Sequence, residues 1–315
     1  MPSSAVRKFT DPDEYAAAIY PSSVDLTVIE RGNFKASQTR IDLHRLWVRR
    51  ACESLPRTAG VEQVAGRAYI SFPATAGSSI VYGGIRVHPG EIVRHNLGRT
   101  YYQTTSGPAH WAAMSLTVDD MAGLGAAIAG SDLTPPHDAL TLHPPQSAMA
   151  KLLGLLATAG RLAGRAPEII ANPDSARGLE QAFIQALVAS LSEGDDREDT
   201  AAQRRHEAIM RRFRRVLQEN PDEPLYLPGI CKAIGVSDRT LRRCCQEHLG
   251  MGPKRYLLLR RMHLARRALR QNSPIEATVA NTATQCGFWH FGRFAGAYQA
   301  LFGETPSATL HRPPG

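Results

Sequence analysis

The feature that most constrains the fold of this chain is a segment in its last third that predicts two helices joined by a tight turn. Residues 227–234 are mainly apolar and are followed directly by Gly235. Glycine is the usual residue just past a helix end, because it adopts the left-handed conformation without steric cost. Ser237 then supplies an N-cap for a second helix, which we expect to run to His248 and to stop before Gly250. Helix, glycine-containing turn and helix are the signature of a helix-turn-helix unit.

The same plan returns about 53 residues further along the chain. Residues 279–286 predict a short helix, Gly287 its end, and residues 290–301 a second helix that stops before Gly303. Between the two units, an amphipathic helix rich in arginine is expected over residues 253–271. Two such units on one rigid connector can reach successive major-groove segments on one face of DNA. The repeat therefore predicts a domain that binds double-stranded DNA.

The charge of the chain is divided unevenly, in a way that agrees with this prediction. The segment from Arg204 to the end holds 19 Lys and Arg against 8 Asp and Glu, a balance of +11. Of the 37 basic and 29 acidic residues in the chain, the preceding part keeps 18 and 21, a balance of −3. A basic excess confined to one segment is expected of a domain that binds a polyanion. The alternative explanation is a charged helical surface that only keeps the domain in solution.

The first half of the chain predicts β-structure. Short apolar-rich runs, such as residues 69–72, 79–82 and 100–105, are separated by glycine and proline turns. Short strands spaced this closely favour a sandwich or barrel over a parallel sheet. The helical pattern then begins after Thr117, and two long apolar-periodic stretches follow at residues 148–162 and 175–191. These two helices either cover their own barrel or pack on a second subunit.

The expected fold class is α+β, with an all-α C-terminal domain. The acidic segment that starts at residue 193 has no apolar face and is the best candidate for a linker. The expected divisions are a domain for ligand sensing and dimerisation at 1–192 (barrel 22–117, helices 118–192), a linker at 193–203, and a DNA-binding domain at 204–315 with units at 227–250 and 279–303.

Composition excludes several other classes of protein. No run of about 18 apolar residues is present, so no membrane span is expected, and residues 1–13 lack the apolar core of a secretory signal. The cysteines are few and show no C-x-x-C spacing, which argues against a disulfide framework and fits a cytoplasmic protein. They are Cys52, Cys231, Cys244, Cys245 and Cys286.

The segment from about His206 to His311 resembles the DNA-binding domain of the AraC/XylS family of bacterial transcription regulators. The resemblance lies in the connector sequence RMHLARRAL at residues 261–269 and in CGFWHFGRFAGAYQALFGETP at residues 286–306. It implies a cupin-like N-terminal sensor for an aromatic or other small organic effector, and an activator that works with RNA polymerase. The two apolar-faced helices that end the N-terminal half favour a homodimer. Many relatives have a basic residue where this chain has Gly296, which leaves open whether the second unit reads bases or mainly positions the protein.

The residues expected to touch DNA lie at the start of the second helix of each unit, because that end enters the major groove. Arginine forks match guanine O6 and N7, an aromatic ring can pack on a thymine methyl, and Ser237 caps its helix or meets a phosphate. Connector arginines are expected to meet phosphates. The candidates are Ser237, Arg239, Arg242 and Arg243 in the first unit, His290, Phe291 and Arg293 in the second, and Arg261 and Arg266 on the connector.

The effector site is expected inside the barrel, where polar and aromatic side chains of the strands converge. Alternation directs only about half of them inward. For a carboxylate ligand, Arg49 or Arg86 would be the natural clamp. The candidates are Trp47, Arg49, Tyr82, Arg86, His88, Tyr102, His110 and Trp111.

Two alternative functions remain open on the sequence. One is a cupin-type metal-dependent enzyme with an accessory DNA-binding domain, but Glu91 stands between His88 and His95 rather than after them, and no catalytic constellation is present. His206 and Glu207 begin like a zinc-protease helix, but Met210 occupies the second ligand position. We therefore expect no metal, no cofactor and no enzymatic activity. The other alternative is a regulator that binds DNA without any ligand.

Overall fold

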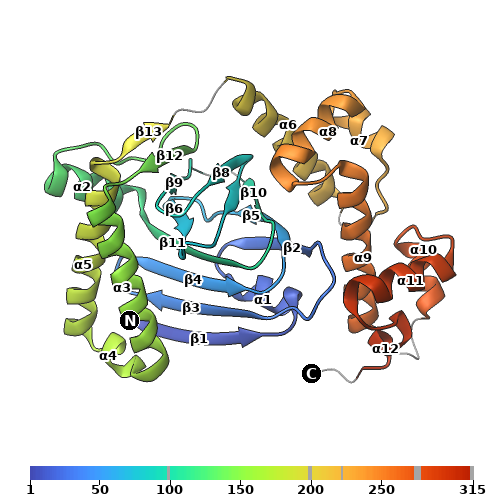
Figure 1. Cartoon of the computed structure of the whole chain (residues 1–315), viewed down its shortest axis with the longest axis horizontal. Coiled ribbons are helices and arrows are strands. Elements are labelled where there is room, and N and C mark those ends of the chain that lie inside the picture. The colour runs from blue at the N-terminus through green and yellow to red at the C-terminus, as the bar shows by residue number, and fades with distance from the viewer. Residues whose placement is uncertain (98–99, 198–200, 221–222, 273–277, 313–315) are drawn as a thin grey trace.

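The computed structural model describes residues 1–97, 100–197, 201–220, 223–272 and 278–312. Figure 1 shows β-structure in the first part of the chain and only helices at its C-terminal end. Two antiparallel sheets form the β-structure. The first has the order β1-β3-β4-β11-β6-β9-β12-β13, and the second β2-β5-β10-β7-β8. This arrangement confirms the expected α+β fold class.

The strands of the first sheet are β1 Ser3–Phe9, β3 Ala36–Asp42, β4 Trp47–Glu53, β11 Ala109–Thr117, β6 Arg67–Pro73, β9 Ile92–Arg94, β12 Leu140–His143 and β13 Asp195–Arg197. Those of the second are β2 Ser23–Val28, β5 Arg57–Glu62, β10 Thr100–Thr105, β7 Ile80–Tyr82 and β8 Ile85–Val87. The β-structure thus begins near residue 3 instead of 22, and helix α1 (Pro12–Ala18) follows the first strand. Strand β1 could not be predicted from the sequence, because it is an edge strand whose side chains are mostly exposed and show no alternation of buried positions.

Four helices follow the barrel: α2 Val118–Ala129, α3 Gln146–Arg165, α4 Pro167–Ala171 and α5 Pro173–Ser192. Helix α2 starts where the sequence predicts, because the Thr117 hydroxyl accepts a hydrogen bond from the amide of Asp120. Apolar side chains of α3 and α5, such as Leu152 and Phe183, are buried in one core with the first sheet. Of the two possibilities for these helices, the structure therefore has them covering their own barrel.

The acidic segment after α5 contains a strand rather than only a linker. Strand β13 pairs with β12, so that Asp195 lies opposite His143. Residues 198–200 of the expected linker lie outside the described residues. Backbone pairing at a sheet edge leaves little trace in a sequence whose side chains are all polar. The division of the chain into 1–192, 193–203 and 204–315 stays a prediction.

The C-terminal helices are α6 Ala201–Glu219, α7 Leu227–Ile234, α8 Asp238–Leu249, α9 Pro253–Gln271, α10 Val279–Gln285, α11 Phe291–Phe302 and α12 Pro306–Leu310. The bounds of α7 to α11 agree with the sequence expectation to within one or two residues, because a glycine or a proline marks at least one end of each of these helices. One core joins α6, α7 and α8 to the first half of α9, and a second joins the other half of α9 to α10, α11 and α12.

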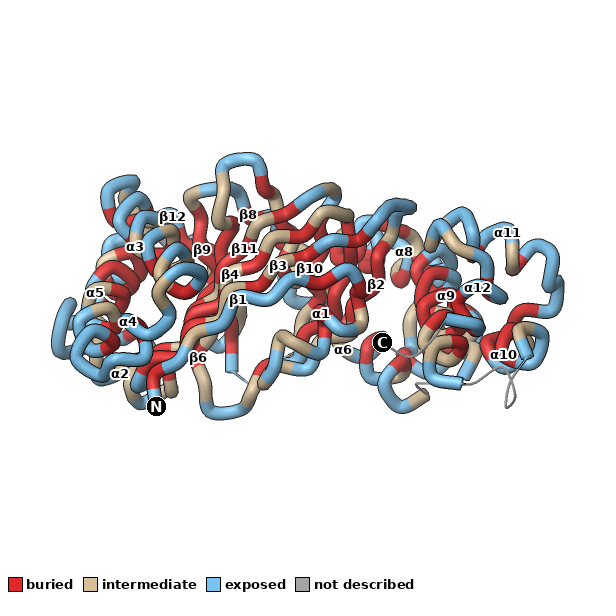
Figure 2. Tube along the Cα trace, turned by 90° about the horizontal axis from the view of Figure 1, so that it is seen from below, coloured by how far each residue is buried: buried red, intermediate tan, exposed pale blue. Residues whose placement is uncertain are grey.

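The long helices α3 and α5 lie on the opposite side of the β-structure from α6–α12 (Figures 1 and 2). The second sheet faces these C-terminal helices: α6 and α8 contact β10, and α9 contacts β2. Across the described ranges, no helix is both long and apolar enough to cross a lipid bilayer.

Candidate functional site

The first helix-turn-helix unit is fixed by its caps. Gly235 adopts the left-handed conformation with φ of +68° and ends α7. The Ser237 hydroxyl accepts a hydrogen bond from the amide of Thr240 at 3.2 Å, and so it caps α8. The buried face of α8 carries Leu241 and Cys244, as the spacing predicts. The fold thereby turns the opposite face of α8 toward solvent.

The exposed face of α8 carries three arginines, and two of them are already paired. The Arg242 guanidinium donates two hydrogen bonds to the Asp238 carboxylate, from Nε to Oδ1 at 3.0 Å and from Nη2 to Oδ2 at 2.7 Å. Arg243 Nε donates to Glu247 at 3.2 Å. Arg239 is exposed and has no ion pair within the described ranges. Exposed pairs contribute about 0–1 kcal/mol, so each arginine can exchange its carboxylate for a base edge or a phosphate at little cost.

The second unit presents an apolar end instead. Phe294 and Tyr298 are buried in its core, while His290 and Arg293 are exposed. Phe291 is 46% exposed, so it belongs to the outer surface and not to the core. Trp289, just before the helix, is 69% exposed and was not among the sequence candidates. Its position next to the expected helix start was the only available signal.

The two connector arginines are placed differently from the expectation. Arg261 is half-buried, and its Nη1 donates to the Gly287 carbonyl at 3.2 Å, so it braces the turn of the second unit. Arg266 is buried, and its Nη1 donates to Asp11 at 2.8 Å. The prediction that Arg266 contacts a phosphate is therefore wrong for this arrangement, because a carboxylate of the N-terminal domain already occupies the guanidinium.

The same carboxylate belongs to a cluster that holds α9 against the N-terminal domain. Asp11 also pairs with Arg270, and Arg270 reaches Glu14 at 3.3 Å. Arg267 lies 3.6 Å from Asp25. Burial would raise the pKa of Asp11, but the charge and hydrogen bond of Arg266, together with the Glu14 amide and the charge of Arg270, outweigh burial and hold that pKa below its ordinary value. Asp11 is therefore an anion between cations of α9.

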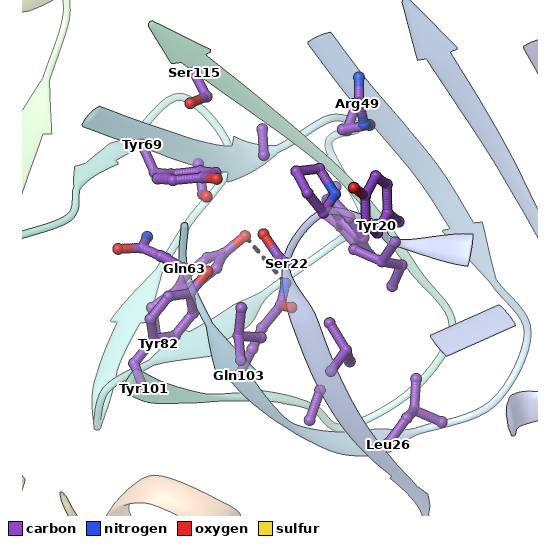
Figure 3. Close-up of a pocket in the computed structure, with 18 of the residues that line it drawn as sticks. Tyr20, Ser22, Leu26, Arg49, Gln63, Tyr69, Tyr82, Tyr101, Gln103 and Ser115 are labelled. Atoms are coloured by element: carbon purple, nitrogen blue, oxygen red, sulfur yellow. Dashed lines mark hydrogen bonds between the residues drawn. The ribbon is translucent and has the colours of Figure 1, made fainter. Parts of the chain in front are cut away.

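A cavity lies between the two sheets, lined by side chains from β2, β4, β5, β6, β7, β10 and β11 (Figure 3). Four of the expected effector residues line it, namely Trp47, Arg49, Tyr82 and Trp111. Arg86 and His88 do not line this cavity, which corrects both assignments: they are exposed, and Arg86 donates to Ser79 at 3.1 Å. Strand β8 sits at the sheet edge, and alternation turns these two side chains outward.

The charged groups that line the cavity, Arg49, Glu53 and Arg57, each have a partner of opposite charge. The buried Glu53 carboxylate accepts from Arg57 Nε at 2.9 Å, from Trp111 at 2.9 Å and from the Tyr15 hydroxyl at 2.7 Å. Arg49 donates to Asp42 at 2.7 Å. Burial would lower the pKa of Arg57, but the charge and hydrogen bonds of Glu53, together with Tyr15 and Tyr82, outweigh burial and raise that pKa. The cavity wall therefore carries no net charge from these two pairs.

Two polar groups of the wall have no partner among the described residues: the Gln63 amide nitrogen and the Tyr69 hydroxyl. Both line the cavity, and both can donate a hydrogen bond. Near them, Gln103 donates to the Tyr82 hydroxyl at 3.2 Å, which Figure 3 marks with a dashed line. The sequence candidates missed Gln63, Tyr69, Tyr101 and Gln103. Tyr69 and Tyr101 lie in expected strands, but the face toward which each side chain points was not evident.

Strand β10 forms a wall shared by the cavity and the C-terminal helices. Tyr101 and Gln103 line the cavity. Tyr102 points the other way, with its ring edge-on to Tyr256 of α9 at 6.1 Å. The Thr104 hydroxyl donates to the carbonyl of His248, in the last turn of α8, at 2.9 Å. Tyr102, expected in the effector site, thus belongs to the domain interface, because successive side chains of a strand face opposite sides.

The histidines and carboxylates considered for a metal serve other contacts. Glu91 accepts from the His88 amide at 2.8 Å and lies 2.7 Å from His143. His95 is stacked on Tyr101 and lies 3.0 Å from the Ser71 hydroxyl, and burial lowers its pKa to about 3. His206 pairs with Glu247. In the part of the chain that the structure describes, no three such side chains gather as a metal site would require.

Comparison with known proteins concerns mainly the C-terminal helices. A family model described as a helix-turn-helix domain matches residues 230–312. The probable thc operon regulatory protein of Rhodococcus erythropolis is 38% identical over 98 residues, which are 31% of this chain and 30% of that protein. The XylDLEGF operon transcriptional activator of Pseudomonas putida is 34% identical over 103 residues, 32% of each chain. This chain thus spans about a third of the length of these curated relatives.

Some solved structures align with most of the chain. The AraC-like transcriptional activator CuxR is 14% identical, covers 90% of this chain and all of its own, and gives a TM-score of 0.44.

Proposed function

We propose that this protein is a sequence-specific DNA-binding regulator of the AraC/XylS family, controlled by a small molecule. The observation that carries this proposal is the pair of helix-turn-helix units on one connector helix, the first with three exposed arginines on α8. We infer an activator, since the relative in Pseudomonas putida is named as one. Contact with RNA polymerase, a cytoplasmic location and the absence of enzymatic activity are part of the proposal.

A homodimer also remains a proposal. The apolar faces of α3 and α5, from which a dimer was inferred, are covered by their own sheet. Any dimer contact therefore needs other surfaces of the N-terminal domain. Sedimentation of the full chain would determine its oligomeric state.

Replacing Arg239 and Arg242 together with alanine is expected to relax base preference. Each good bidentate contact with guanine contributes about 1–3 kcal/mol of discrimination, so each loss should cost roughly tenfold in specificity. Binding-site selection followed by sequencing measures the profile for the full chain and the variant. Arg177→Ala is the matched control, because Arg177 is also an exposed helical arginine with a carboxylate partner. An unchanged profile for the double variant would remove the assigned base readers.

The effector is best matched by an uncharged molecule. The charged side chains that line the cavity are already paired, and two hydrogen-bond donors, Gln63 and Tyr69, have no partner among the described residues. A carbonyl-like oxygen facing these two donors therefore fits the cavity better than a carboxylate. Burying an ion without a counter-ion costs several kcal/mol. Arg49 is engaged by Asp42 and Arg86 is outside, so the carboxylate clamp expected from the sequence finds no support.

We expect benzamide to stabilise the chain more than benzoate, since the two differ mainly in charge. A ligand at 100 times its dissociation constant adds about 2.7 kcal/mol to the free energy of unfolding. Thermal melting of the full chain with benzamide, acetophenone and other uncharged aromatics, each beside its carboxylate, is the measurement. Tyr69→Phe should reduce the effect, while Tyr20→Phe, an exposed hydroxyl at the cavity rim, is the control. Stronger stabilisation by carboxylates would contradict an uncharged effector, and no stabilisation by any member would favour a regulator without a ligand.

A further inference from the structure

A second hollow lies between the second sheet and the C-terminal helices, on the other side of β10 from the cavity between the sheets. Its volume is about 600 Å³, within the range of about 300–1,000 Å³ that small-molecule sites occupy. We call it the interdomain cleft. Its floor includes Asp25, Gly60 and Tyr102 of the sheet, and its other walls include Arg214 of α6 and Arg260 and Arg267 of α9.

Gly60 stands at the centre of the floor. Its register partners are Asp25 on β2 and Tyr102 on β10, so the three residues form one row across the sheet. A Cβ built at Gly60 would lie 3.3 Å from Nε of Arg214, so this guanidinium occupies the space that a side chain would need. The row therefore seats one cation of α6 against the backbone of the sheet.

Arg214 is a buried cation that the described residues do not neutralise. It is 5% exposed. Its Nη1 donates to the carbonyls of Val61 and Tyr101, and no carboxylate of a described residue lies within ion-pair distance of it. Carbonyl groups leave the net charge in place, and a buried charge without a counter-ion is costly. An anion that enters the cleft from solution would supply the counter-ion.

Tyr102 gives a second, independent sign of a missing partner. It is 3% exposed, and it lines the same cleft as Arg214. The ring of Tyr256 stands edge-on to it, but the Tyr102 hydroxyl makes no hydrogen bond to any described residue. Buried polar groups in native proteins are nearly always hydrogen-bonded. The hydroxyl is therefore a donor without an acceptor, next to a cation without an anion.

The cleft as a whole is positive. Three arginines line it, and Asp25 is the one carboxylate among its described lining residues. Arg267 lies 3.6 Å from Asp25, so these two charges offset each other. Arg214 keeps the rest of the cleft positive.

A phosphate group fits this arrangement better than a carboxylate does. The donors come from separate elements, Tyr102 from β10 and the arginines from α6 and α9. A phosphate monoester presents three acceptor oxygens in different directions and carries a charge of about −1.5 to −2 at neutral pH. A carboxylate presents only two oxygens in one plane and a single charge. Arginine forks also match phosphate oxygens two at a time.

We propose that the interdomain cleft is a second small-molecule site, which binds a metabolite through a phosphate group held by Arg214 and Tyr102. Its residues come from the sheet and from the C-terminal helices, so only the docked arrangement of these two parts completes it. A bound phosphate compound therefore stabilises that arrangement. This inference goes beyond the proposed function and does not require the chain to bind DNA.

Thermal melting of the full chain at constant ionic strength is the first test. The probes are inorganic phosphate, glycerol 3-phosphate and ribose 5-phosphate, and the controls are glycerol, ribose and succinate. At 100 times its dissociation constant, a phosphate probe should raise the melting temperature by roughly 5 °C. The absence of a shift with all three probes would overturn the proposal. A shift with succinate as large as with the phosphates would overturn the assignment to phosphate.

Isothermal titration calorimetry with the probe that gives the largest shift then tests the cation. Arg214→Gln should weaken binding by about tenfold or more, because hydrogen bonds between arginine and phosphate are among the strong ones. Arg215→Gln is the matched control: Arg215 is the next residue of α6 and is exposed, so its charge is screened and the affinity should stay within about twofold. Equal losses in the two variants would show a nonspecific effect of charge and overturn the site.

Tyr102→Phe tests the site without removing a charge. The substitution deletes only a hydroxyl that has no partner among the described residues, so the variant should melt at or above the native temperature when phosphate is absent. It should nevertheless bind the probe about threefold or more weakly. An unchanged affinity would overturn the role of Tyr102.

Tyr69→Phe separates the two sites, because Tyr69 lines the cavity between the sheets and is not among the residues of the cleft. This variant should bind the phosphate probe as the native chain does. A loss as large as that of Tyr102→Phe would place the phosphate in the other cavity and overturn a second site. Failure of phosphate binding would leave the DNA-binding proposal untouched, since none of these measurements involves DNA.

Discussion

Replacing Glu53 with alanine is expected to lower the free energy of unfolding of the N-terminal domain by about 3–5 kcal/mol. Glu53 is 0% exposed and Arg57 is 1% exposed. Removal of the carboxylate would leave the guanidinium charge buried without its counter-ion, and it would also remove the acceptor for Tyr15 and Trp111. A loss of this size is a large part of the stability of an ordinary domain.

Urea unfolding followed by tryptophan fluorescence measures the effect, because Trp111 contacts the mutated group. Asp174→Ala is the control: its carboxylate also pairs with an arginine, but both side chains are exposed, so we expect a change within about 1 kcal/mol. A Glu53→Ala chain that unfolds at the same urea concentration as the native chain would contradict the role given to this pair.

Replacing Asp11 with asparagine is expected to release α9 from the N-terminal domain. In the native chain, the Asp11 carboxylate caps α1 by accepting hydrogen bonds from the amides of Asp13 and Glu14. The side-chain oxygen of asparagine can accept the same two bonds, so the substitution keeps this N-cap. It removes the charge that holds Arg266 and Arg270. Hydrogen bonds to charged groups contribute about 1.5–3 kcal/mol, so DNA affinity without effector should rise about tenfold if docking competes with binding.

The salt dependence of DNA binding gives a second measure of the Asp11→Asn variant. Each freed arginine that meets a phosphate should steepen the slope of log affinity against log salt by about 0.9. Asp119→Ala, an exposed carboxylate at the start of α2, is the control. A variant with the affinity and salt slope of the native chain would show that the Asp11 cluster does not compete with DNA.

The sequence predicts the helical part of the molecule well for a local reason. Each helix of the repeat is bounded by a residue with a strong conformational preference, such as Gly235, Gly250 or Pro253, and these signals do not depend on distant contacts. The exposed arginines of α8 follow from helical spacing in the same way. Trp289 was missed because an aromatic residue beside a core is usually buried, and only the structure shows it exposed.

The cavity could be predicted only in part, because its residues come from seven strands that meet by long-range pairing. The pattern within one strand does not tell which face is inward, so Tyr101 and Tyr102 could not be separated. The burial of Arg266 could not be predicted either, because it also depends on a long-range contact. Its partner Asp11 is 255 residues away, and no local signal links the two.

Strand β10 has a consequence for how this protein can change its specificity. Only strand β10 separates the cavity, on the side of Tyr101 and Gln103, from His248 at the end of α8, so under the proposed function a ligand would act on α8 through these two residues. Trp47 and Trp111 stand on strands of the other sheet, away from this partition. If the proposed function holds, we expect substitutions at these two positions to alter which compound the cavity accepts while the contacts between β10 and α8 stay unchanged.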